Sequence, residues 1–144
     1  MRTMLFAALA ALAMAAPAQA QSNDPFAGTW AFQSQPYGNE QFGVIMSGAM
    51  TATRERGDAY TVRLTANELI ISRADGQSRM LTAYQTCRGE RSGEVFNITC
   101  QIAEAPEGYQ PDNFILQRGE GEQASQLVGA MTGNGTQVTF SRVR

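Results

Sequence analysis

The side chains that could do chemistry in this sequence are carboxylates, tyrosines and arginines. It contains no His and no Lys, so all 11 basic residues are Arg. Without imidazole there is no Ser-His-Asp or Cys-His nucleophile and no histidine metal ligand, and without Lys there is no Schiff base or P-loop ammonium. A pair of carboxylates could hydrolyse glycosides, but no motif brings two of them together. We therefore expect a protein that is not an enzyme and uses neither a metal nor another cofactor.

Acidic residues gather late in the chain, in segments expected to be loops. These residues are Glu104, Glu107, Asp112, Glu120 and Glu122. Carboxylate-rich loops can bind Ca²⁺, but the spacing matches no calcium-binding loop. We expect these side chains to form a solvated face.

Two methionines alternate with small residues along one face of an expected strand. Met46 and Met50 share this face with Gly48 and Ala52. If the face points into a barrel, the small residues leave room for a small apolar ligand, and Met adapts to irregular shapes. The alternative is that neighbouring large side chains fill the space, as happens in many eight-stranded barrels.

Tyrosines could add hydroxyl groups to such a site. Tyr109 lies in the irregular segment 103–113, which is either a lid over the barrel mouth or a solvated loop. Tyr84 lies on an expected strand, where it and Tyr60 are expected to be buried and to satisfy their hydroxyls locally. The candidate ligand-binding residues are therefore Met46, Met50, Tyr84 and Tyr109.

The N-terminus has the pattern of a cleavable secretory signal over residues 1–20. Arg2 precedes an apolar run over residues 4–16, and Ala18-Gln19-Ala20 is the small-x-small pattern that a signal peptidase recognises. The run is shorter than the roughly 20 residues that a membrane-spanning helix needs. We expect a bacterial protein that is periplasmic or secreted, with no transmembrane helix in the mature chain.

The expected mature chain is mildly acidic and carries one pair of cysteines. Removing Arg2 leaves 10 Arg against 13 acids, a net charge of −3, which argues against a nucleic-acid partner. In an oxidising compartment Cys87 and Cys100 are expected to form a structural disulfide across one hairpin. A redox-active pair is disfavoured because the spacing is nothing like Cys-x-x-Cys.

Alternation of apolar and polar residues with period two dominates the mature chain and predicts strands. The expected strands after the first cover residues 42–53, 60–65, 69–71, 80–87, 95–102, 114–117, 126–131 and 136–143. Turns are expected at 56–58, 75–76 and 88–93, and Val138 and Phe140 are expected to face inward. We predict an all-β fold, a single antiparallel up-and-down barrel of about eight strands over residues 26–144, after a flexible segment 21–25.

The opening of the first expected strand, Gly28-Thr29-Trp30, resembles that of the calycin barrels, which include lipocalins and avidins. The resemblance implies that Trp30 closes one end of the barrel and that Arg142 of the last strand packs on its indole, a cation–π contact. Biotin binding is not implied, because Trp30 is the only Trp.

The function expected from these features is binding rather than catalysis. The leading hypothesis is a small, largely apolar ligand in the barrel mouth. The alternative is a protein partner, since the chain is also similar to small periplasmic inhibitors of secreted metalloproteases. That similarity implies that segment 21–25 enters the protease cleft.

Overall fold

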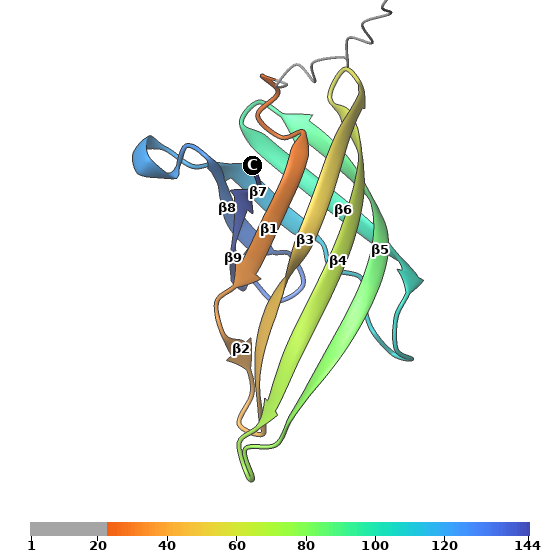
Figure 1. Ribbon diagram of the computed structural model, residues 1–144, viewed down its shortest axis with the longest axis vertical. Coiled ribbons are helices and arrows are strands. Elements are labelled where there is room, and N and C mark those ends of the chain that lie inside the picture. Colours follow the sequence, from red (N-terminus) through yellow and green to blue (C-terminus); the bar gives the residue numbers. More distant parts are fainter. Residues whose placement is uncertain (1–22) are drawn as a thin grey trace, which may run out of the picture.

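The computed structural model describes residues 23–144, which form nine β-strands and one short 3₁₀ helix (Figure 1). The elements are β1 (Gly28–Ser34), β2 (Tyr37–Gly38), β3 (Phe42–Arg56), β4 (Ala59–Ser72), β5 (Ser78–Ser92), β6 (Val95–Glu104), β7 (Phe114–Arg118), η1 (Gly121–Gln123), β8 (Gln126–Met131) and β9 (Gln137–Arg142). The expected signal peptide, residues 1–20, lies outside the described residues, as do Gln21 and Ser22.

Eight strands close into one antiparallel barrel with meander connections, which confirms the predicted fold class. Each strand pairs with the next from β3 to β9, and β1 pairs with both β9 and β3. The two-residue strand β2 is added beside β3 at Tyr37, opposite Val44. Closure gives each barrel strand a partner on both sides over part of its length. The first part of β5, Ser78 to Ala83, pairs only with β4.

Strands β3, β4 and β5 are much longer than the others and extend past them at one end of the barrel (Figure 1). Sequence patterning divided β4 into two strands, 60–65 and 69–71, and this division was wrong. The strand is continuous because Asn67 pairs with Ser47 on β3 and with Thr82 on β5. The Thr82 hydroxyl also donates to Asn67 Oδ1 at 2.8 Å, which satisfies this polar side chain within the sheet.

The turn expected over residues 88–93 is also shorter than predicted. Strand β5 runs on to Ser92, and only Gly93 and Glu94 form the turn, with Gly93 at a φ of 60°. Gly89 lies within this strand, and its lack of a side chain leaves room for the ring of Phe96. A Cβ atom at this position would lie 2.5 Å from the ring of Phe96. The glycine that was interpreted as a turn residue is therefore a packing residue.

Cys87 and Cys100 form the predicted disulfide. They lie directly opposite each other on β5 and β6, with Cα atoms 4.0 Å apart, and both side chains are buried. By restricting the unfolded chain over a loop of this length, the bond is expected to stabilise the fold by roughly 3 kcal/mol.

The inner face of the barrel carries one continuous apolar core. Val138 and Phe140 face inward, as predicted, with 3 % and 0 % of their surfaces exposed. Phe140 stacks on Phe32 with ring centroids 4.8 Å apart, and Phe114 meets both rings edge-on. The barrel is thus filled near its middle by a cluster of three phenylalanines.

Candidate functional site

One end of the barrel is closed around Trp30, which is 1 % exposed. Trp30 and Arg142 lie opposite each other on β1 and β9, and the guanidinium carbon is 4.3 Å from the centroid of the indole. Gly28 makes this contact possible. A Cβ atom at Gly28 would lie 2.6 Å from Arg142 Nη1, and its φ of 126° is rarely accessible to other residues. A cation–π pair therefore links the first and last strands in addition to their backbone pairing.

Arg142 also binds the chain that precedes β1. Its guanidinium donates to the carbonyl oxygens of Ala27 at 2.5 Å, Pro25 at 3.1 Å and Asp24 at 3.3 Å. The Asp24 carboxylate in turn accepts a hydrogen bond from the Tyr60 hydroxyl at 2.9 Å. Asp24 and Pro25, part of the segment expected to be flexible, are therefore held against the closed end.

The middle of the barrel leaves little of the room that the sequence suggested beside Met46 and Met50. Both methionines face inward and are fully buried. A Cβ atom at Gly48 would lie 2.8 Å from the ring of Phe32, so this ring occupies the space above the glycine. At this level the barrel follows the alternative in which large side chains pack the interior.

A cavity of about 420 Å³ lies at the opposite end, where β3, β4 and β5 extend past the other strands. The segment that joins β6 to β7 forms one wall, and the inner faces of β4 and β5 form another. The lining residues are Tyr37, Glu68, Leu81, residues 106–113, Met131, Gly133 and Asn134.

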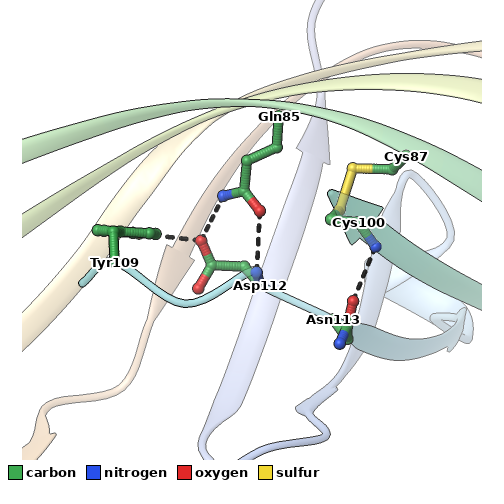
Figure 2. Close-up of a disulfide and its surroundings, with 6 residues drawn as sticks. All are labelled: Gln85, Cys87, Cys100, Tyr109, Asp112 and Asn113. Carbon is green, nitrogen blue, oxygen red and sulfur yellow. Dashed lines mark hydrogen bonds between the residues drawn. A yellow bond between two sulfur atoms is a disulfide. The ribbon is translucent and has the colours of Figure 1, made fainter. Parts of the chain in front are cut away.

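The most buried polar group of this cavity is Asp112, which is 5 % exposed. Figure 2 shows Asp112 and the side chain of Gln85, from the inner face of β5, exchanging two hydrogen bonds. Gln85 Nε2 donates to Asp112 Oδ2 at 2.6 Å, and the backbone N–H of Asp112 donates to Gln85 Oε1 at 2.9 Å. The Tyr109 hydroxyl donates to the same carboxylate oxygen at 2.9 Å. Gln85 thus fixes the loop to the barrel wall.

Asn113, the next residue, fixes the same loop at the disulfide (Figure 2). Its Oδ1 accepts a hydrogen bond of 2.7 Å from the backbone N–H of Cys100. Its carbonyl oxygen accepts another, of 2.9 Å, from the backbone N–H of Thr132. The cavity wall formed by this loop is therefore attached to β5, to β6 and to the β8–β9 turn.

A second carboxylate lies on the β4 side of the cavity. Glu68 is on the inner face of β4, in register with Met46 on β3 and Leu81 on β5. Its Oε1 accepts a hydrogen bond from the Tyr37 hydroxyl at 3.0 Å. The cavity therefore holds two pairs of the same kind, each a tyrosine that donates to a carboxylate.

The electrostatics of the two pairs are coupled. Burial raises the pKa of Asp112, although the hydrogen bonds from Gln85 and Tyr109 oppose it. Burial also raises the pKa of Glu68, the hydrogen bond from Tyr37 opposes it, and the charge of Asp112 raises it further. The pKa values of both tyrosines rise, through burial and then through the neighbouring carboxylate charges. The charge of Asp112 thus makes Glu68 more costly to ionise.

The structure does not bring the four candidate ligand residues together. Tyr109 lines the cavity, whereas Met46 and Met50 lie in the packed core below it. Tyr84 is 49 % exposed on the outer face of β5, so the expectation that its side chain is buried was wrong. Its neighbours in sequence, Ala83 and Gln85, are the residues that face inward.

Sequence reasoning missed Tyr37, Glu68 and Gln85, and it placed Asp112 on a solvated face. A signal was present for two of them. Glu68 and Gln85 are polar residues at positions where the alternation of β4 and β5 requires inward-facing side chains. A polar residue at an inward-facing position of a strand indicates either that it lies near an end of the barrel or that it makes a buried hydrogen bond. Asp112 gave no such signal, because its burial depends on how an irregular segment folds back.

Replacing Asp112 with asparagine is expected to stabilise the protein at pH 7 and to weaken the fall in stability as pH rises from 4. The folded state raises the pKa of Asp112 above the ordinary 3.8, so it binds the proton more tightly than the unfolded state. Stability is then lost as pH rises from the unfolded pKa through the folded one. Asparagine keeps an acceptor for Gln85 and Tyr109 and has no charge to bury.

Urea unfolding of both proteins at several pH values between 4 and 7 measures this difference. Glu40→Gln is the control, because Glu40 is exposed at the same end and does not line the cavity. A constant difference between wild type and Asp112→Asn across this range would contradict the assignment.

Comparison of the chain with protein-family models and with the curated proteins finds no match. Within residues 23–144, no helix is long and apolar enough to cross a membrane. In the same residues, no three or more His, Cys, Asp or Glu side chains are grouped so that they could hold a metal ion.

Proposed function

We propose that this chain is an exported, non-catalytic binding protein of the calycin type, which takes a small, largely apolar molecule at the open end of its barrel. The cavity of about 420 Å³ beside Leu81, Tyr109 and Met131 is the observation that carries this proposal. Its volume lies within the range of small-molecule sites, and it combines apolar walls with a few convergent polar groups. The closed end, with Gly28, Trp30 and Arg142 in the expected arrangement, supports the calycin assignment.

The two carboxylates of the cavity favour binding over acid–base catalysis. Glycoside hydrolysis and similar reactions need one protonated and one ionised carboxyl group, so the environments of the two must push their pKa values apart. Here the pKa values of Glu68 and Asp112 are both raised, and burial is the main cause for each. Burial thus acts on both carboxyl groups in the same direction and does not by itself assign them opposite roles.

Protease inhibition through segment 21–25 has less support. An inhibitory segment must be free to enter a cleft, whereas Asp24 and Pro25 are bound to Arg142 at the closed end. We therefore place the binding site at the open end.

Native mass spectrometry of protein purified from its own source tests the proposal. We expect the wild type to carry a non-covalently bound small molecule. Gly133 lines the cavity and has no atom within 4 Å of an added Cβ, so Gly133→Trp has room to occupy cavity space. This variant should lose the bound molecule, and Gly133→Ala should keep it. Wild-type protein without a bound molecule, or equal retention in Gly133→Trp, would overturn the proposal.

A further inference from the structure

Negative charge in the cavity has no positive counterpart. Three acids line it, Glu68, Glu107 and Asp112, and no arginine is among the lining residues. In the described chain no salt bridge joins any of the three to an arginine. From this arrangement we infer that the ligand carries a cationic group, an ammonium or a guanidinium, on an apolar or aromatic body. The inference rests on the proposed function and names the chemical class of its ligand.

Both carboxylates that accept tyrosine hydrogen bonds retain an oxygen for a ligand. Asp112 Oδ2 accepts from Gln85 and Tyr109, whereas Oδ1 accepts no hydrogen bond from the described residues. Glu68 Oε1 accepts from Tyr37, and Oε2 likewise accepts none from them. No fully buried side-chain polar atom of the described residues lacks a partner, so Asp112 Oδ1 keeps some accessible surface, and Asp112 lines the cavity. The two groups therefore present free acceptors on a shared surface.

The remaining lining fits a cation with an apolar body. Tyr37 and Tyr109 place aromatic rings in the wall, and an ammonium over a ring face is attracted by its quadrupole. Leu81 and Met131 provide apolar contact area, and the thioether of Met adapts to different shapes. An anionic ligand would meet three carboxylates and no cation, which is strongly unfavourable where burial lowers the dielectric. The pocket therefore discriminates by charge sign.

Two probes of equal shape test the inference. Benzyltrimethylammonium and neopentylbenzene differ by the replacement of N⁺ with carbon, and the quaternary nitrogen cannot lose its charge with pH. Binding to the full mature protein is measured by shifts of backbone NMR signals around the cavity. We expect the cation to bind at least about tenfold more tightly than the neutral probe. 3-Phenylpropionate, the anionic probe, should not bind.

Variants of the two carboxylates locate the effect. The double variant Glu68→Gln and Asp112→Asn should lose the preference for the cation while it retains the affinity for neopentylbenzene. Glu40→Gln, at the same end but outside the lining, should behave as the wild type. Binding of neopentylbenzene by the double variant also shows that this variant is folded.

The possible outcomes separate the inference from the proposed function. Equal binding of the two isosteric probes, or tighter binding of the anion, would overturn the cationic ligand and leave a small-molecule site standing. A preference for the cation that survives in the double variant would overturn the assignment to these carboxylates. Absence of binding by all three probes would overturn the inference, whereas the native mass measurement decides the proposed function separately.

Discussion

Arg142→Met is expected to lower the free energy of unfolding by about 2–4 kcal/mol, because it removes several interactions at once. The guanidinium lies over Trp30 and donates to three carbonyl oxygens of the chain before β1. Methionine has similar length and packs on the indole, but it cannot donate. The three carbonyls would then depend on solvent, and the segment from Asp24 to Ala27 would lose its main attachment to β9.

The chain's single tryptophan makes this effect measurable at the site itself. Trp30 is buried and donates from Nε1 to the carbonyl oxygen of Phe26 at 3.0 Å. Loss of Arg142 should shift its fluorescence to longer wavelength and lower the urea midpoint. Arg144→Met is the matched control, since Arg144 is exposed near the chain end and should change neither property. Equal midpoints for the two variants would show that the closed end does not depend on Arg142.

Arg142→Lys separates charge from geometry. Lysine keeps the positive charge over the indole, but its ammonium is a point donor and cannot reproduce the fork that reaches three carbonyls. We expect a stability between those of the wild type and Arg142→Met. If lysine restores full stability, the cation–π contact alone would account for the effect.

The closed end could be predicted because the Gly28-Thr29-Trp30 opening resembles that of the calycin barrels, and this resemblance implies that Arg142 packs on Trp30. Gly28 and Trp30 are two residues apart, and Arg142 lies on the strand that closure must place beside them. The alternation of apolar and polar residues likewise predicted that Val138 and Phe140 face inward. A short motif and a period-two pattern can both be recognised without knowledge of contacts between residues that are distant in sequence.

The open end could not be predicted in the same way because it depends on contacts distant in sequence. Gln85 and Asp112 are 27 residues apart, and Tyr37 and Glu68 are 31 apart. Asp112 is buried only because an irregular loop folds back onto β5, and no periodic pattern describes such a loop. Alternation placed Met46 and Met50 on one face of an expected strand, but it could not show that Phe32, from a different strand, fills the space beside them.

Phe32→Ala is expected to lower the free energy of unfolding by about 3–5 kcal/mol, the cost of removing a buried phenylalanine and leaving a cavity. The ring is 4 % exposed, stacks on Phe140 and covers Gly48. Other aromatic rings and Gly48 border the position, and we expect the surrounding structure to relax into the space only in part. Phe32→Leu, which retains most of the volume, should cost less and provides a folded variant if alanine is not tolerated.

Phe42→Ala is the control for this loss, because Phe42 is 41 % exposed at the extended end of β3. It should cost less than about 1 kcal/mol, since little apolar area is removed from the core. Urea unfolding of the variants gives the comparison. Equal costs at Phe32 and Phe42 would show that the middle of the barrel is not tightly packed.

The Phe32 variants also distinguish a ligand site at the mouth from one at the centre. If molecules bind only at the mouth, the wild type should show benzene-induced NMR shifts there and none around Phe114 and Phe140. Phe32→Ala should add shifts at these two rings, because a dry apolar cavity of aromatic size binds benzene. Shifts at the central rings in the wild type would mean that the barrel opens further than its packing indicates. We therefore expect the ring of Phe32 to set the depth of the proposed binding site.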